Sequence, residues 1–374
     1  MVIMALDHTR DFFHVTAWTQ NPLDLTVTTP ILFFTRWITH FCAPIFVFLS
    51  GISIYLQSFR KSKKELSVFL ITRGLWLILM EVTLINLSFS FDLHYYTLVL
   101  QVIWVIGISM VILGLLIFLP FQVILFIGLI IVFGHNWLDQ FEQPMRQQSF
   151  MWDLLHRQSF HPLWKRHMLG ILYPFLPWTG LMCLGYCCGK LYRRKVDHTH
   201  RRKALTYLGF GVILFFILLR ATNTYGDPFK WSTQKSLLYT ILSFVNTQKY
   251  PPSLLFMCMT IGPALLFLAW MEPVKNWLTR IFTVYGRVPF FYYLIHFYLI
   301  HAVCTLLFFV RGHHLEEGLN TKKFFPANFI IPGEGYSLGT VYLIWLAIVI
   351  ALYPLCKWYG EYKAKHRHWW LSYL

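Results

Sequence analysis

Charged residues are scarce in this sequence. Only 13% of its 374 residues are charged, against about a quarter in an average soluble domain, whereas 57% are hydrophobic. Several apolar runs, among them 68–87, 97–119 and 288–310, reach the roughly 20 residues that a membrane-spanning helix needs. This composition excludes a soluble globular protein and predicts an all-α, polytopic transmembrane helical bundle. No stretch remains for a separate soluble domain, so we expect residues 1–374 to form one integral membrane domain.

The sequence also lacks the cysteine and histidine spacings of metal sites. Its seven cysteines include no CxxC pair, and no His/Cys pair has convincing ligand spacing. Cys187 and Cys188 are adjacent, and most of the others lie within or beside apolar runs. We therefore expect neither a disulfide framework nor a bound metal.

Acidic residues are half as numerous as basic ones. The sequence has 16 Asp and Glu against 32 Lys and Arg, which gives a formal net charge of +16. The basic residues cluster at 60–64, 193–203 and 357–367, each beside an apolar run. Such clusters mark the cytoplasmic ends of membrane spans and differ from the basic face of a nucleic-acid-binding protein. We expect a lipid bilayer as partner and no nucleic acid.

About ten to eleven spans are expected, with both termini in the cytoplasm. Only six residues precede Asp7, which make about 9 Å of helix, so either the first span is a stub or the natural chain starts upstream of Met1; we expect the second. Gly185 and Gly189, four residues apart, predict close helix packing. The remaining spans are placed near 41–57, 67–90, 97–119, 121–138, 168–192, 205–221, 252–271, 288–310 and 337–357.

Polar residues gather in the loops that this topology places on the outer side. These loops are 7–40, 139–167, 222–250 and 311–336, and they carry His, Asp, Asn and Trp. The inner loops are mostly short and basic. Because functional residues tend to lie on loops that a rigid scaffold positions, we expect any chemistry to face outward.

The densest polar group begins at Asp7. If the helix continues, Asp7, Asp11 and His14 share one face, and His8 is offset by about 100°. A carboxylate beside an imidazole is the arrangement of a general base. We therefore take His8, His14, Asp7 and Asp11 as candidate catalytic residues. The alternative is a polar helix end at the membrane interface, with Arg10 pairing Asp11.

His40 is a fifth candidate catalytic residue, at the mouth of the second span. Arg36 lies one turn earlier on the same face, and Pro44 follows one turn later. A proline interrupts the hydrogen bonds of a helix and would leave a carbonyl free toward a cavity. The alternative is a kinked helix with an interfacial histidine.

Other polar and aromatic residues are candidates for substrate binding. The loop 223–252 offers donors and flat apolar faces that suit a sugar or nucleotide, although an ordinary interfacial hairpin would look similar. Two histidines inside the run 288–310 suggest a polar cavity or, alternatively, an interhelical hydrogen bond. The candidates are Asp24, Arg36, Asn223, Asp227, Trp231, Asn246, Lys249, His296 and His301.

Six stretches carry a family resemblance. They are MALDHTRDFFH (4–14), TTPILFFTRWITHFCAPIFVFLSG (28–51), YPFLPWTGLMCLGYCCG (173–189), NTYGDP (223–228), SFVNTQKYPPSL (243–254) and GRVPFFYYLIH (286–296). With these motifs the chain resembles the bacterial branch of the heparan-alpha-glucosaminide N-acetyltransferase catalytic-domain family, and the resemblance covers essentially the whole chain.

The resemblance implies an enzyme of roughly eleven spans in the bacterial inner membrane. Such an enzyme takes acetyl-CoA on the cytosolic side and transfers the acetyl group to a sugar amine on the other side. Family members usually carry a short Arg, Asp, Arg-Gly segment before the MALDH-like stretch, which this sequence lacks. The active-site asparagine and aspartate of the animal enzyme fall on His8 and His40 here. Its catalytic histidine has no clean counterpart, and His14 is the histidine inside the corresponding loop.

Together these features predict a membrane acetyltransferase with acetyl-CoA as donor and a saccharide or amino sugar as acceptor. They are also compatible with a homodimer. Arg287, at the cytoplasmic start of a span, would attract the donor's phosphates. His8 or His14 would act as base, oriented by Asp7 or Asp11. His40 and His296 would stabilise the oxyanion or hold the acetyl group. The alternative is a transporter or flippase for a saccharide or lipid-linked sugar.

Overall fold

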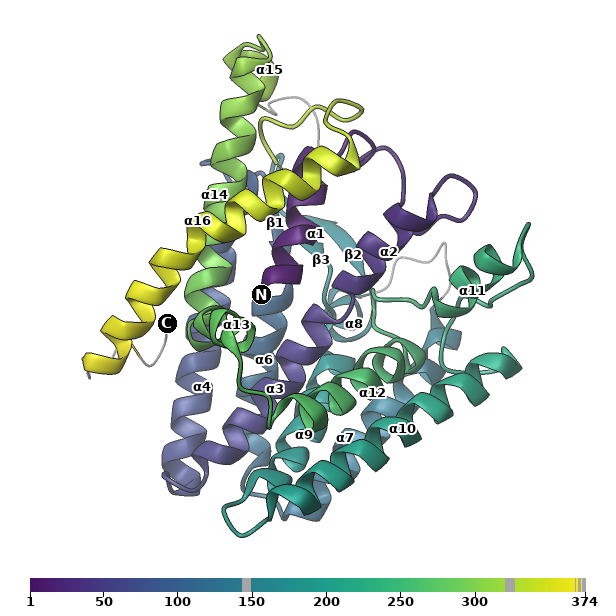
Figure 1. Cartoon of the computed structure of the whole chain (residues 1–374), viewed down its shortest axis with the longest axis vertical. Coiled ribbons are helices and arrows are strands. Elements are labelled where there is room, and N and C mark those ends of the chain that lie inside the picture. Colours follow the sequence, from purple (N-terminus) through teal and green to yellow (C-terminus); the bar gives the residue numbers. More distant parts are fainter. Residues whose placement is uncertain (143–148, 320–326, 367, 369–370, 372–374) are drawn as a thin grey trace.

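A computed structural model describes residues 1–142, 149–319, 327–366, 368 and 371 (Figure 1). The chain forms a bundle of helices that confirms the all-α prediction. Its helices are α1 (Val2–Phe13), α2 (Pro30–Thr39), α3 (Cys42–Gln57), α4 (Lys63–Met80), the π-helix η1 (Glu81–Ile85), α5 (Asn86–Ser90), α6 (Val102–Leu116), α7 (Phe121–Gly134), the 3-10 helices η2 (His135–Phe141) and η3 (Gly189–Tyr192), α8 (Phe150–Leu155), α9 (Phe175–Cys188), α10 (His198–Thr222), α11 (Leu237–Val245), α12 (Leu254–Met271), α13 (Trp277–Arg287), α14 (Pro289–Val310), α15 (Leu315–Gly318) and α16 (Leu338–Lys365).

Seven helical segments among the described residues are long and apolar enough to cross a membrane. They make the chain a polytopic membrane protein, as its composition predicted. The segments are Pro30–Gln57, Lys63–Ser90, Phe121–Phe141, His198–Thr222, Leu254–Met271, Pro289–Val310 and Leu338–Lys365.

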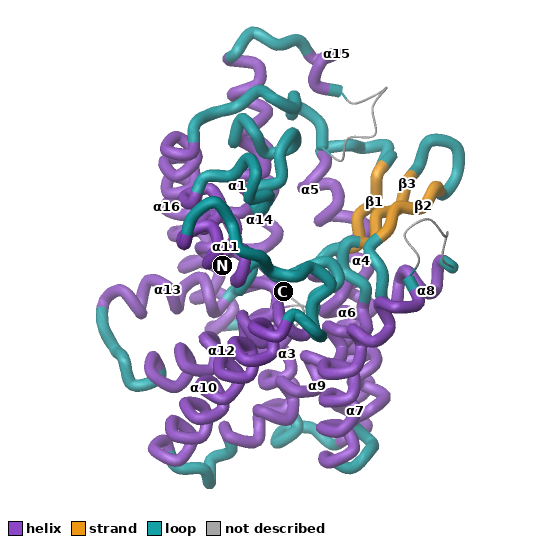
Figure 2. The backbone as a smooth tube through the Cα atoms, turned by 90° about the vertical axis from the view of Figure 1, so that its right-hand side faces the viewer, coloured by secondary structure: helices purple, strands orange, loops and turns teal. Residues whose placement is uncertain are grey.

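The prediction is wrong for the first residues of two expected spans, 97–119 and 168–192. Each begins as a short strand, and the helices that follow, α6 and α9, have only 15 and 14 residues. The strands β1 (Thr97–Leu100) and β3 (Met168–Ile171) are parallel, and β2 (Ser159–Pro162) pairs antiparallel to β3 (Figure 2). Hydropathy alone does not separate a short apolar strand from the start of an apolar helix, which explains the error.

The helices α3 and α9 pack closely through glycines, as the spacing of Gly185 and Gly189 predicted. A Cβ atom on Gly185 would lie 2.2 Å from the carbonyl oxygen of Phe48, and one on Gly189 would lie 2.5 Å from Cβ of Tyr55. Only residues without a side chain allow this approach, which brings the two backbones together.

Burial separates an inner layer of helices from an outer one. In α12, 72% of the apolar window is buried inside the protein, whereas only 17% is buried in α16 and 22% in α10. Large apolar side chains such as Leu214 and Leu218 on α10 and Leu343 and Ile350 on α16 are exposed on the protein surface. These outer helices present the apolar surface that a lipid bilayer would cover.

Candidate active site

The first helix, α1, lies inside the bundle and carries charge there. It packs against α2, α14 and α16. Apolar residues bury it at both ends, with Met4 and Ala5 before the charged stretch and Phe12 and Phe13 after it. This packing holds charged side chains of the intervening turn in the protein interior, where they require partners.

Asp7 is the centre of the charges on α1. Its Oδ1 accepts a hydrogen bond from Nη2 of Arg10 at 3.1 Å, and its Oδ2 is paired with the guanidinium of Arg36 on α2. Arg10 Nη2 also donates to Oδ1 of Asp11 at 2.6 Å. Asp7, Arg10, Asp11 and Arg36 therefore form one network of two carboxylates and two guanidinium groups, in which the charges balance. We call these four residues the charged cluster.

Lys249 adds a further positive charge to this region. It is buried, 8% exposed, and interacts electrostatically with both Asp7 and His40. Among the described residues its ammonium group makes no hydrogen bond, although it lies 5.1 Å from the centre of the Tyr250 ring. It is therefore available to bind a polar atom of a substrate.

Two histidines meet beside the charged cluster. The ring centroids of His8 and His296 are 5.3 Å apart, and His8 also contacts Phe297. His296 is fully buried, and its Nδ1 lies 3.0 Å from the carbonyl oxygen of Tyr292. Because a carbonyl only accepts, Nδ1 carries the proton, and Nε2 of a neutral His296 presents a lone pair. That Nε2 is buried and has no hydrogen-bond partner in the described part of the chain.

His40 is the third histidine of this region. It lies at the end of α2, where the helix breaks before α3 begins at Cys42. The expectation that Pro44 interrupts the helix is wrong: α2 ends before it, and Pro44 occupies the first turn of α3, where its missing N–H costs no helical hydrogen bond. His40 is 1% exposed, and neither ring nitrogen has a hydrogen-bond partner among the residues described.

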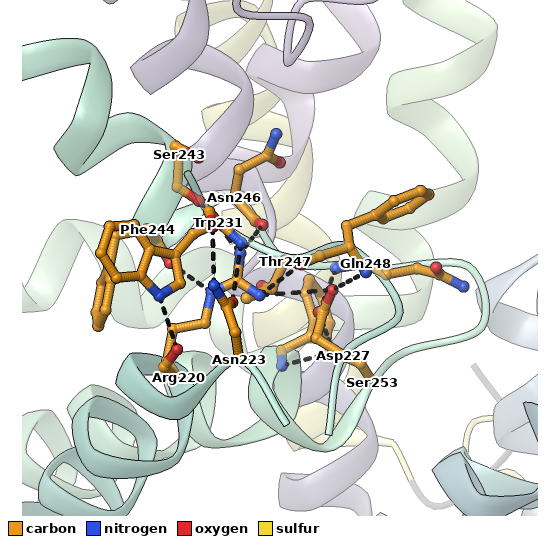
Figure 3. Close-up of polar contacts among 12 residues, drawn as sticks. Arg220, Asn223, Asp227, Trp231, Ser243, Phe244, Asn246, Thr247, Gln248 and Ser253 are labelled. Atoms are coloured by element: carbon orange, nitrogen blue, oxygen red, sulfur yellow. Dashed lines mark hydrogen bonds and ion pairs between the residues drawn. The ribbon is translucent and has the colours of Figure 1, made fainter. Parts of the chain in front are cut away.

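The loop after α10 is held by Arg220. This side chain is 2% exposed and donates to the main-chain carbonyls of four residues, with distances from 2.7 to 3.1 Å (Figure 3). Nη1 of Arg220 also lies 3.7 Å from Oδ1 of Asp227. The four carbonyls belong to Phe229, Ser243, Phe244 and Asn246.

Four of the candidate substrate-binding residues take part in holding this loop. Asp227 accepts hydrogen bonds from the N–H groups of Phe229 and Gln248 and from the Ser253 hydroxyl, and burial raises its pKa. Asn223 makes two hydrogen bonds with the main chain of Trp231, whose indole N–H donates to the carbonyl of Arg220. The Asn246 amide donates to Leu23 in the loop between α1 and α2. We call Arg220, Asn223, Asp227, Trp231 and Asn246 the Arg220 network.

Three other candidates, His14, Asp24 and Arg287, are not part of the charged cluster. His14 ends α1, where its backbone pairs with Tyr336 and its Nδ1 lies 3.0 Å from the hydroxyl of Thr16; partial burial lowers its pKa. Asp24 is exposed, and hydrogen bonds from the N–H and hydroxyl of Thr26 lower its pKa. Arg287 is exposed at the end of α13.

His301 differs from His296 although both lie on α14. Its Nδ1 is 3.2 Å from the carbonyl of Ser88 and its Nε2 is 2.9 Å from the carbonyl of Asn328. The ring also stacks on Phe91 at 3.8 Å between centroids. His301 therefore connects α14 with α5, through Ser88, and with the segment that contains Asn328.

Sequence reasoning missed two buried histidines, His135 and His156. They lie at the ends of α7 and α8 and contact each other, with Nδ1 of His135 3.3 Å from Nε2 of His156. His135 directly follows the apolar run 121–134, so its position at the end of a span was the available signal. His156 lies 21 residues later, and nothing in the sequence links the two.

Comparison with known proteins gives one family. A family model described as heparan-alpha-glucosaminide N-acetyltransferase, catalytic, matches residues 1–220, which include the charged cluster, His8 and His40. No curated protein and no solved structure gives a significant match.

Proposed function

Because the chain belongs to the heparan-alpha-glucosaminide N-acetyltransferase catalytic family, we propose that it acetylates a saccharide across the membrane. Membership implies transmembrane acetyltransferase activity in general, a family donor of acetyl-CoA and a saccharide acceptor. Our proposal adds that acetyl-CoA enters from the cytoplasm and that the acceptor is an amino sugar or another saccharide on the opposite side.

One observation carries this proposal. Next to a charged cluster whose carboxylates and guanidinium groups are paired, His40 and His296 keep buried ring nitrogens that have no partner among the described residues. Leaving a buried polar atom unpaired costs about 1–3 kcal/mol. Such atoms are therefore expected where water or a substrate supplies the missing hydrogen bond.

His8 is the residue that we assign as general base. It is partly exposed, makes no hydrogen bond with the described residues, and its ring centroid lies 5.3 Å from that of His296. Both carboxylate oxygens of Asp7 are paired with arginines, so Asp7 positions Arg10 and Arg36 and contributes negative charge. His296 lies next to the His8 ring. His14, one turn beyond Arg10, would contact the acceptor at the outer end of α1.

The proposed reaction is a direct transfer. The acceptor amine or hydroxyl attacks the thioester carbonyl while His8 takes its proton, and the carbon–sulfur bond breaks as the new bond to the acetyl group forms. His8 then gives this proton to the sulfur atom, and coenzyme A leaves as the thiol. Lys249 and His40 would donate hydrogen bonds to the carbonyl oxygen, where negative charge develops. Arg287 would bind the phosphates of the donor on the cytoplasmic side.

The test is transfer of labelled acetyl from acetyl-CoA by the purified full chain in lipid nanodiscs, with a panel of amino sugars as acceptors. We expect label on the sugar, and its loss in His8→Ala. The matched control is His314→Ala, which changes an exposed histidine far along the chain and should keep the activity.

A negative result would have a clear meaning. If the folded wild-type protein neither binds acetyl-CoA nor moves label, the enzyme proposal fails. Uptake of a labelled saccharide by sealed vesicles would then support the transporter or flippase alternative. If label accumulates on the protein and passes to the sugar afterwards, the direct transfer is wrong and an acetyl-histidine takes its place.

A further inference from the structure

A second group of ionisable side chains lies away from the charged cluster, where α7 and α8 end. Asp139 belongs to η2, Glu142 follows that helix, and His156 ends α8. One potential ligand atom from each of these three residues lies within 4.8 Å of the other two. The sequence did not point to the group because 14 residues separate Glu142 from His156.

Contacts within this group centre on His156, whose side chain is completely buried. Its Nδ1 is 2.8 Å from Oε1 of Glu142, and its Nε2 is 3.8 Å from Oδ1 of Asp139. His135 approaches the same Nε2 at 3.3 Å, and the other nitrogen of His135 is buried without a partner in the described residues. The imidazole of His156 is therefore surrounded by carboxylates and a second imidazole.

Within the described part of the chain, no lysine or arginine balances the charge of this group. Among the described residues, neither Asp139 nor Glu142 forms an ion pair with a lysine or arginine, and their side chains are only 29% and 18% exposed. A protonated His156 would supply one positive charge against two negative ones. Carboxylates that are largely removed from water are usually paired or coordinate a metal ion, and a divalent cation would balance these two.

We propose that Asp139, Glu142 and His156 bind a divalent metal ion, with Zn²⁺ as the best chemical match. Zn²⁺ accepts nitrogen and carboxylate oxygen ligands at about 2.0–2.2 Å, and in a tetrahedral site such ligands are about 3.3–3.6 Å apart. Asp139 approaches Nε2 of His156 at 3.8 Å and Glu142 approaches Nδ1 at 2.8 Å, so one carboxylate must move to the ring nitrogen that the other faces before both can bind the same metal ion. Ca²⁺ and Mg²⁺ prefer shells of six or more oxygen atoms, which a site with imidazole does not offer.

The position of the group gives the metal a structural role. Asn136, one turn before Asp139, donates to Oδ2 of that carboxylate at 2.9 Å. The amide oxygen of Asn136 accepts a hydrogen bond at 2.8 Å from the main-chain N–H of Leu254, where α12 begins. A metal here would therefore tie the loop after α7 to α8 and to the segment that carries Lys249.

The test is the metal content of the full chain, purified without a polyhistidine tag, loaded with Zn²⁺ and dialysed. We expect about one Zn²⁺ per chain in the wild type and its loss in His156→Ala and Asp139→Asn, since each removes one of three ligands. The control is His161→Ala. His161 lies on β2, five positions after His156, and pairs with Asp153 at 2.8 Å, but it has no part in the group, so this variant should keep the metal.

Two results would overturn the site. One is a wild-type protein that holds no more zinc than His156→Ala; the other is equal loss of zinc in His161→Ala, which would trace the loss to a disturbed loop. If the variants do not fold, the test uses the wild-type protein loaded with Co²⁺ in place of Zn²⁺. Intense visible bands of tetrahedral Co²⁺ support the site, and their absence rejects it. This outcome does not depend on acetyl transfer.

Discussion

The charged cluster and the Arg220 network are built from similar residues but differ in how their hydrogen bonds are completed. In the Arg220 network, the guanidinium group donates to four main-chain carbonyls and the Asp227 carboxylate accepts three hydrogen bonds. Beside the charged cluster, His40 and His296 keep three ring nitrogens that have no partner in the described residues. Both regions are buried, so burial alone does not distinguish a binding site from a scaffold.

The difference has a physical reason. A buried network stabilises a fold only when each polar atom has its partner, and a partly completed one destabilises it. A region that keeps buried polar atoms without hydrogen-bond partners is thus expected to bind water or a ligand. We infer that the Arg220 network holds the loop after α10 rigid and that the region of His8, His40 and His296 performs the chemistry.

The largest expected effect follows from removing Arg220. Arg220→Met leaves four main-chain carbonyls and the buried Asp227 carboxylate without their cationic partner, which should lower the free energy of unfolding by about 3–5 kcal/mol. Thermal unfolding in detergent, followed by tryptophan fluorescence, measures this. Arg202→Met is the control, because Arg202 is exposed on the same helix. Equal stability of the two variants would contradict the scaffold role.

Two histidines on α14 test whether the region around His8, His40 and His296 performs the chemistry. His296→Gln should lower kcat without lowering the unfolding temperature, by at most the about 10²–10⁴-fold that a general base contributes, because it removes the imidazole that lies beside the base His8. His301→Gln should leave kcat unchanged and cost about 1–3 kcal/mol of stability, since it removes the hydrogen bond that the neutral ring donates to the carbonyl of Ser88 or of Asn328. Acetyl-transfer kinetics and thermal unfolding separate the two. If both variants lose only stability, His296 is structural as well.

Trp231 allows a smaller test of the Arg220 network. Trp231→Phe removes the hydrogen bond of 2.9 Å to the carbonyl of Arg220 and keeps an aromatic ring against Phe244. We expect a loss of about 1 kcal/mol in stability and an unchanged KM for the acceptor. A raised KM at unchanged stability would instead show that Trp231 contacts the sugar.

The smallest effect is expected at His313, outside both regions. Glu317 and Glu334 raise the pKa of this imidazole through hydrogen bonds at 2.8 and 2.9 Å. Since its pKa is higher in the folded chain, its contribution to stability is fully present below about pH 6.5 and is lost as the pH rises through the raised pKa. The difference in unfolding temperature between wild type and His313→Ala should shrink from pH 6 to about pH 8. A constant difference would show that packing is responsible.

The candidate residues could be named from the sequence, but their grouping could not. Five residues separate His296 from His301, which places them about 140° apart around a helix, so they face different neighbours. Only the fold shows that His296 meets α1 and that His301 meets Ser88 and Asn328. In the same way, Asp7 and Arg36 are 29 positions apart, and the loop between them does not reveal their contact.

The sequence by itself determined that this chain is a helical membrane protein, where most of its spans lie, and which family it resembles. These are local properties of composition, hydropathy and spacing. The tertiary structure decided which polar groups are paired and which are left for a ligand. Burial and hydrogen bonding depend on neighbours that the fold brings from distant segments, as with the four carbonyls around Arg220 and the carboxylates around His156.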